Sequence, residues 1–77
     1  MNIYVSNVNF KMKDEELRAL FERFGEVESA RIIHNKETGR SQGYGFVVMP
    51  DDLDAQKAIE EINGKIIQGR DLRVKIA

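Results

Sequence analysis

The chain contains no cysteine, no tryptophan and a single proline. Without cysteine it has neither a disulfide nor a thiolate metal site. The first five residues, MNIYV, are not a basic segment followed by a long apolar run, so the sequence predicts neither a signal peptide nor a membrane span. We expect one cytoplasmic domain over residues 1–77, with a thin core, because chains of this size bury only about 60% of the surface they expose when unfolded.

An excess of basic residues, the usual mark of a phosphate-binding protein, is also missing. Twelve Lys and Arg stand against 13 Asp and Glu, for a net charge of -1. The distribution is more informative than the sum, because Arg31, Arg73 and Lys75 fall in segments that we predict to be strands. The acidic residues of the two predicted helices are Asp14, Glu15, Glu16, Glu22, Asp51, Asp52, Asp54, Glu60 and Glu61. If helices and strands occupy opposite faces, one face is acidic and the other is basic.

Two segments have the apolar spacing of amphipathic helices. The first begins at Asp14, and Gly25 fits its C-terminal stop. Its predicted core residues are Leu17, Leu20, Phe21 and Phe24. The second is capped by Asp51 and ends at Asn63 and Gly64. Its predicted buried stripe is Ala55, Ala58, Ile59 and Ile62.

Four short segments have the alternation and composition of strands: residues 3–7, 27–34, 43–49 and 72–76. Residues 35–42 form a polar turn, and residues 65–69 form a short hairpin-like connection. The order of elements is therefore βαββαβ. Two helices among four strands can cover only one face of the sheet, which predicts the α+β ferredoxin-like sandwich with a four-stranded antiparallel sheet.

The alternation assigns strand residues to the two faces of that sheet. The small, aliphatic residues suited to packing against helices are Ile3, Val5, Ala30, Ile32, Gly45, Val47, Leu72 and Val74. Gly45 would let a helix approach closely. Tyr4, Tyr44 and Phe46 then point outward, where an open sheet face normally carries polar residues. Aromatic rings fixed on a rigid sheet can stack on nucleobases, so this face is a candidate site for single-stranded nucleic acid.

These residues resemble a known family. The segment 42–49, QGYGFVVM, is similar to the RNP1 element of the RNA-recognition motif, and segment 3–8, IYVSNV, is similar to its RNP2 element. The resemblance extends to the turn 38–41 and to the pairs 24–25, 63–64 and 69–70, so it covers nearly the whole chain. Because the sequence starts at Met1 and holds one motif, it also resembles the stand-alone, single-motif RNA-binding proteins of bacteria.

The resemblance implies that Tyr4 stacks on one base, that Phe46 stacks on the next, and that Tyr44 packs against the sugars between them. It implies that the partner is short single-stranded RNA, with single-stranded DNA as an alternative, and that the domain is a monomer without a cofactor or small-molecule substrate. Two positions depart from the motif: Gln42 replaces Lys or Arg, and Met49 replaces an aromatic but points into the core. The remaining predicted RNA-binding residues are Asn2, Arg31, Ile33, Arg40, Gln42, Arg73 and Lys75.

Other functions receive less support from the sequence. The aromatic face could instead bind a peptide or a second protein, so a protein-interaction module is the alternative function. An acylphosphatase-like enzyme would need an arginine just after the first strand, where residues 9–13 hold only lysines as basic residues. His34, the only histidine, has no ligating partner in the sequence and is better suited to touching RNA from a loop. We therefore expect neither catalysis nor a metal site.

Overall fold

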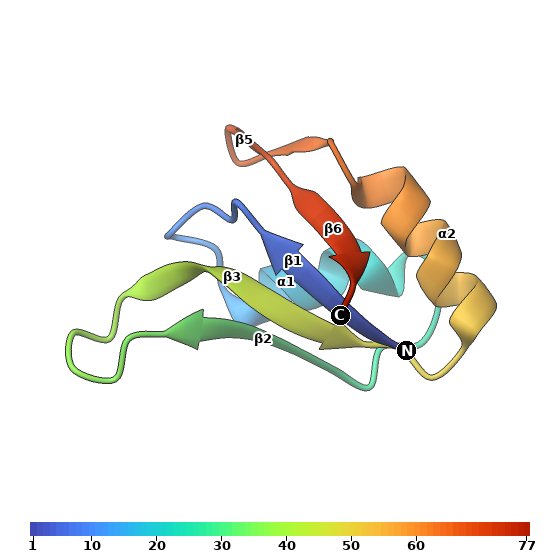
Figure 1. Cartoon of the computed structure of the whole chain (residues 1–77), viewed down its shortest axis with the longest axis horizontal. Coiled ribbons are helices and arrows are strands. Elements are labelled where there is room, and N and C mark those ends of the chain that lie inside the picture. Colours follow the sequence, from blue (N-terminus) through green and yellow to red (C-terminus); the bar gives the residue numbers. More distant parts are fainter.

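The computed structural model describes residues 1–77 and has two helices and six strands (Figure 1). The main elements follow the predicted βαββαβ order, with a small hairpin inserted before the last strand. Their bounds are β1 Asn2–Ser6, α1 Asp14–Glu22, β2 Ser29–His34, β3 Ser41–Val48, α2 Asp52–Ile62, β4 Ile66–Ile67, β5 Arg70–Asp71 and β6 Arg73–Ile76.

The four long strands form one antiparallel sheet in the order β2-β3-β1-β6. In Figure 1, α1 lies behind the sheet and α2 lies beside β6, so the face of the sheet toward the viewer is left uncovered. This arrangement confirms the predicted ferredoxin-like sandwich. The two strands with the RNP-like sequences, β1 and β3, are the central ones, and β2 and β6 are the edges. Neither helix has the length and apolar character needed to cross a membrane.

The core lies between the sheet and the helices, and it contains no polar side chain. Leu17 and Phe21 of α1 are fully buried, as predicted. Leu20 and Phe24 are only partly buried and pack against the core. Helix α1 ends at Glu22, with Arg23 as its C-cap, shortly before the predicted stop at Gly25. Met49 is fully buried, which confirms that it points inward. The other buried residues are Ile3, Val5, Val8, Met12, Val27, Ile32, Gly45, Val47, Ala55, Ala58, Ile62, Leu72 and Val74.

Gly45 has a different role from the predicted one. A Cβ at this position would lie 2.3 Å from the carbonyl oxygen of Arg31, an impossible distance. The close neighbour is thus the backbone of strand β2, and not a helix. The register between β2 and β3 shifts between Ile32 and His34, where the pairing is irregular. Gly45 therefore allows two strands to approach each other beside this irregularity.

The connection at residues 65–69 is a hairpin, in which β4 and β5 pair antiparallel. Its two turn residues, Gln68 and Gly69, have φ angles of 52° and 82°. Two successive positive φ angles are typical of a type I′ turn, whose twist matches the twist of the two strands that it joins. The usual sequence of such a turn is Asn-Gly or Asp-Gly, which explains why the Gln-Gly pair marks the hairpin only weakly.

Strand β6 is an edge of the sheet, and the end of α2 covers part of it. The side-chain oxygen of Asn63 accepts a hydrogen bond of 2.9 Å from the backbone N–H of Val74. The N–H of Gly64 donates to the carbonyl of Leu72, and the N–H of Leu72 donates to the carbonyl of Lys65. The helix C-terminus thus binds backbone groups that an edge strand would otherwise expose.

Candidate nucleic-acid interface

Two aromatic residues and two basic residues form one row across the open face of the sheet. In the strand register Arg31 is opposite Phe46, Phe46 is opposite Tyr4, and Tyr4 is opposite Lys75. Side chains directly opposite each other in an antiparallel pair have Cβ atoms about 4.5 to 5.5 Å apart. The row therefore runs from the β2 edge to the β6 edge as cation, ring, ring, cation.

A second row lies next to the first and contains Tyr44, Ser6 and Arg73. The centroid of the Tyr44 ring lies 5.8 Å from the centroid of the Tyr4 ring and 6.2 Å from that of the Phe46 ring. The centroids of Tyr4 and Phe46 are 5.5 Å apart. Such spacings are typical of mutually stabilising aromatic pairs. The three rings form one cluster, which we call the aromatic platform.

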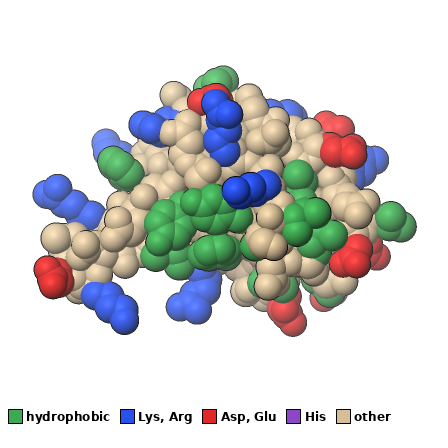
Figure 2. Space-filling model, viewed as in Figure 1, with side chains coloured by type: hydrophobic (Ala, Val, Ile, Leu, Met, Phe, Trp, Pro, Cys, Tyr) green, Lys and Arg blue, Asp and Glu red, His purple; other side chains and the backbone are tan.

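The platform remains accessible from the open face. Phe46 is 39% exposed, and Tyr4 and Tyr44 are partly buried against their neighbours. Figure 2 shows a green cluster over the middle of the sheet, surrounded by Lys and Arg side chains, while most acidic side chains lie on the side of α2. Apolar rings beside solvent-exposed cations can contact both the bases and the phosphates of an unpaired strand.

The basic residues of the first row are free to bind anions. Arg31 and Lys75 are exposed, and neither takes part in an ion pair within the protein. The Lys75 ammonium nitrogen lies 5.5 Å from the centroid of the Tyr4 ring, within the range of a cation–π contact. Lys75 is therefore held beside the ring while it keeps its hydrogen-bond donors free.

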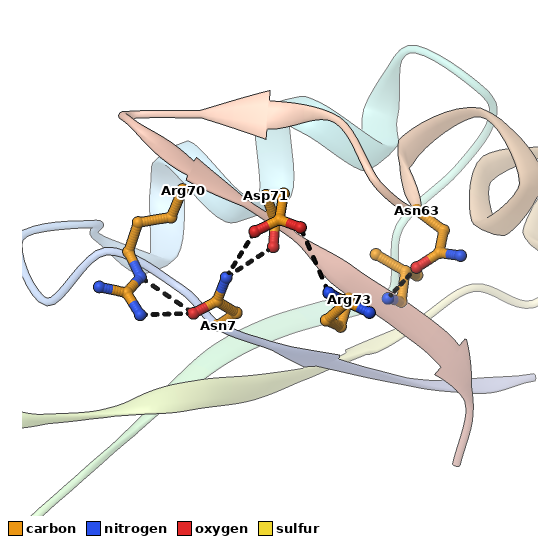
Figure 3. A network of polar contacts seen from close by, with 6 residues as sticks. Asn7, Asn63, Arg70, Asp71 and Arg73 are labelled. Atoms are coloured by element: carbon orange, nitrogen blue, oxygen red, sulfur yellow. Dashed lines mark hydrogen bonds and ion pairs between the residues drawn. The ribbon is translucent and has the colours of Figure 1, made fainter.

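Arg73 differs, because it belongs to a polar network at the end of the sheet (Figure 3). Its guanidinium lies 3.4 Å from a carboxylate oxygen of Asp71. Asp71 also accepts a hydrogen bond from the Asn7 side chain, and the oxygen of Asn7 accepts bonds from Arg70. Asn7 has a φ of 58°, which turns the chain away from β1. The network joins the ends of β1 and β5 and holds Arg73 near the platform.

The other predicted residues lie around the platform in different settings. Asn2 is exposed and opposite Val48. Ile33 is partly buried and lies in the irregular part of β2, outside the regular rows. Arg40 and Gln42 are exposed near the start of β3, where Gly43 with a φ of 80° interrupts the regular alternation. The structure thus brings Tyr4, Tyr44, Phe46, Arg31 and Lys75 together and places the others at the rim.

One exposed ring is absent from the predicted set. Phe10, in the loop between β1 and α1, is 69% exposed. It alternates in the sequence with Val8 and Met12, which are both buried, so strand spacing would assign Phe10 to the core and not to an exposed position. The available signal was a large aromatic side chain shortly after the RNP2-like segment. No cluster of three or more His, Cys, Asp or Glu residues is placed to hold a metal ion.

Comparison with known proteins agrees with this geometry. The family model described as RNA recognition motif matches residues 3–73, and the chain belongs to this family. It is similar to the crystal structure of RNA Binding Protein PG1, with 52% identity, a TM-score of 0.97, and coverage of 100% of this chain and 93% of that one. It is 37% identical to Sex-lethal in a protein/RNA complex, with a TM-score of 0.94 over 99% of this chain and 46% of that one.

Curated relatives include longer proteins. The 31 kDa chloroplastic ribonucleoprotein of Nicotiana sylvestris is 41% identical over 97% of this chain. Glycine-rich RNA-binding protein 10 of Brassica napus is 42% identical over 96% of it. The chain spans 24% of the length of the first protein and 44% of the second.

Proposed function

We propose that this domain binds single-stranded RNA on the aromatic platform and acts by binding alone, without catalysis. The observation that carries the proposal is the row Arg31, Phe46, Tyr4 and Lys75 across the uncovered face of the sheet. Unpaired bases can stack on the rings while the cations at both ends contact phosphates. The names of the relatives, among them a ribonucleoprotein and a protein/RNA complex, support RNA as the nucleic acid.

The positions of the three rings support a separate role for each. Tyr4 and Phe46 are neighbours in one row, so two successive bases can stack on them. Tyr44, displaced to the second row, is placed to contact the sugars between those bases. Arg31 and Lys75 lie beyond the rings on either side, where a strand crossing the sheet would bring its phosphates.

The platform is small, and this limits the affinity of one domain. Stacking contributes about 1 to 3 kcal/mol per base, so three aromatic contacts contribute roughly 3 to 9 kcal/mol before ordering costs. This range corresponds to dissociation constants from about millimolar to sub-micromolar. We propose that the domain is a monomer in the cytoplasm, and that it reads two to four nucleotides on its own, about one to two per stacking ring.

The test is the substitution Phe46→Ala, assayed by isothermal titration calorimetry with short random-sequence RNA. Loss of one stacking contact should lower the affinity by about 1 to 3 kcal/mol, or roughly 5- to 150-fold. The matched control is Leu53→Ala, which removes another exposed apolar side chain from the helical side of the domain. It should leave the affinity unchanged.

An NMR titration of the native domain should locate the bound strand. The backbone amides of β1 and β3 should shift most, because the rings of the platform belong to these strands. Equal affinities of the native and Phe46→Ala domains, or shifts confined to α1 and α2, would contradict RNA binding on the platform. Shifts of β1 and β3 on addition of a peptide or a second protein, but not of RNA, would instead support the protein-interaction module.

A further inference from the structure

Asn63 and Gly64, which follow helix α2, form a pair with a chemical reactivity of its own. In an Asn-Gly pair the glycine nitrogen can attack the side-chain amide carbon of the asparagine, because glycine has no Cβ to hinder the approach. Each remaining asparagine of the chain is followed by a larger residue, in the pairs Asn2-Ile3, Asn7-Val8, Asn9-Phe10 and Asn35-Lys36. Asn63 is therefore the asparagine of this chain that is most prone to this reaction.

The reaction forms a bond between the nitrogen of Gly64 and the Cγ atom of Asn63. The nitrogen loses its proton to solvent, the side-chain amide leaves with a proton as ammonia, and a cyclic imide remains. Water then adds to one of the carbonyl carbons of the imide and breaks its bond to the nitrogen. The product is either aspartate or isoaspartate, in which the backbone runs through the side chain. Both products carry a carboxylate where the native chain has a neutral amide.

The fold restrains this pair. The ψ angle of Asn63 is 124°, which turns the nitrogen of Gly64 away from the Asn63 side chain. The side-chain oxygen of Asn63 accepts a 2.9 Å hydrogen bond from the N–H of Val74, and the N–H of Gly64 donates a 2.7 Å bond to the carbonyl of Leu72. Because these bonds hold the reacting groups apart, the imide forms only when the end of α2 separates from β6.

This separation is a local event. Asn63 and Gly64 are both exposed, and apart from the adjacent residues no atom lies within 4 Å of the position that a Cβ of Gly64 would occupy. The bonds that must break join a helix end to an edge strand, and breaking them leaves the other three strands of the sheet paired. Local openings of this kind require less free energy than global unfolding. Solvent can therefore reach the pair while the rest of the domain stays folded.

The Asn63 side chain also lies beside the cations of the open face. It borders a cleft of about 330 Å³ at the β6 edge. The cleft is lined by Tyr4, Ser6, Asn63, Arg73, Val74 and Lys75. Figure 3 shows the Asn63 side chain reaching β6 next to Arg73. A carboxylate at position 63 would attract the side chains of Arg73 and Lys75, in competition with the phosphates of a bound strand.

We propose that Asn63 is a modification site that deamidates spontaneously when the end of α2 separates from β6, and that the new carboxylate weakens RNA binding at this edge. The part that concerns RNA rests on the proposed function. The modification needs no enzyme, and refolding does not reverse it. The affinity of the domain for RNA then depends on the age of the molecule.

The first test follows the position and the rate of deamidation by mass spectrometry of proteolytic peptides. The domain is incubated in neutral buffer, both native and unfolded in urea. Asn63 should convert before any other asparagine in both conditions. Its conversion should be at least about tenfold slower in the native domain, because only the open fraction of the molecules reacts.

The matched control is Gly64→Ala, compared with the native sequence in urea, where its effect on the fold does not matter. The added methyl group should slow the conversion of Asn63, and equal rates would overturn attack by the following nitrogen. Equal rates in the folded and unfolded chains would overturn the restraint by β6. Earlier conversion of another asparagine, or conversion of Asn63 in urea alone, would overturn the assignment of the site.

The second test uses Asn63→Asp, which carries the charge of one product and keeps an oxygen that can accept the bond from Val74. Calorimetry with short random-sequence RNA should show an affinity about 2- to 5-fold lower at low salt. The loss should shrink as the salt concentration rises, because salt screens the charge, whereas a loss of structure would persist. Gln56→Glu, an exposed substitution that adds the same charge on α2, should leave the affinity unchanged.

The outcomes separate this inference from the proposed function. If Phe46→Ala weakens RNA binding and Asn63→Asp does not, the proposed function stands and the effect of the carboxylate is refuted. A loss in Asn63→Asp that is the same at every salt concentration would also overturn that effect. If the native domain binds no RNA, the proposed function itself fails, and the part of the inference that concerns RNA fails with it.

Discussion

Gly45 occupies a point in the sheet where no side chain fits. Its neighbours in β3, Tyr44 and Phe46, both carry rings of the platform, so the spacing of β2 and β3 at this glycine sets where those rings stand relative to Arg31. The requirement is steric, because a Cβ would meet the backbone of Arg31 and Ile32 and not a flexible side chain. The absence of a side chain at Gly45 therefore maintains the spacing of β2 and β3 beside the platform.

Gly45→Ala should lower the free energy of unfolding by about 1 to 3 kcal/mol, because the strands must separate to admit the methyl group. Urea denaturation measures this change. Gln42→Ala, an exposed substitution in the same strand, should change the free energy by less than about 0.5 kcal/mol. Equal stabilities of Gly45→Ala and the native domain would mean that β2 moves aside at no cost.

The outward direction of Tyr4, Tyr44 and Phe46 could be predicted, because successive side chains of a strand point to opposite faces of the sheet. Val5 and Val47 are aliphatic and occupy the buried face, so the neighbouring aromatic residues must occupy the open face. The binding roles of the predicted residues remain predictions. Phe10 could not be placed in this way, because its alternation with the buried Val8 and Met12 would assign it to the core, whereas its ring is exposed. Its position depends on hydrogen bonds of Asn9 and Val8 to residues far along the chain.

At the scale of elements, the first turn of α1 binds the sheet as well as the helix. Asp14 accepts a 2.8 Å hydrogen bond from the backbone N–H of Ile32 in β2. Glu16 accepts one from the N–H of Lys13 at the start of the helix, and its second oxygen accepts one from the side chain of Gln68. The acidic residues at this helix start therefore join three parts of the fold, in addition to their favourable interaction with the helix dipole.

Asp14→Ala should lower the free energy of unfolding by about 1 to 3 kcal/mol, because a partly buried backbone N–H loses its charged acceptor. Thermal or urea denaturation can detect this loss. The control is Glu15→Ala in the same turn, which has the same effect on the dipole but forms no hydrogen bond. It should cost at most about 1 kcal/mol. If both variants lose the same amount, the contact with Ile32 contributes nothing.

The apolar periods of the sequence were enough to predict which helices and strands form. They were not enough to predict the contacts that the ends of these elements make with one another. The start of α1 followed from its apolar spacing, yet the bond from Ile32 to Asp14 depends on how the helix crosses β2. Gly25 was predicted as the stop of this helix, and the helix ends slightly earlier, at Glu22 with Arg23 as its C-cap, although Phe24 continues the apolar spacing. Asp51 was correctly predicted as a cap, and its side chain accepts a bond from the N–H of Asp54.

Across the whole molecule, charge is separated between the two layers. The net charge is only -1, but acidic residues are frequent in the helices, and Arg31 and Lys75 stand on the open face. The separation is incomplete, since α1 also carries Arg18, which is paired with Glu22. A domain without net positive charge can still present a locally positive surface to RNA.

The affinity for RNA should fall with salt, but at a modest slope, because only a few cations lie near the platform. Arg31→Gln should reduce the magnitude of this slope by about one. Lys57→Gln, an equal change of charge on α2, should leave it unaltered. Dissociation constants measured over a series of salt concentrations give the slope. A steep slope in the native domain would mean that the phosphates follow a different path over the surface.

The hydrogen bonds from the end of α2 to β6 have a consequence for how several such domains can be joined. The Val74 amide is already bound by Asn63, so an incoming strand cannot use it to extend the sheet at this edge. At the β6 edge, neighbouring domains or copies must then associate through side chains and not by sharing a β-ladder. Growth of the sheet into continuous aggregates is hindered at this edge in the same way.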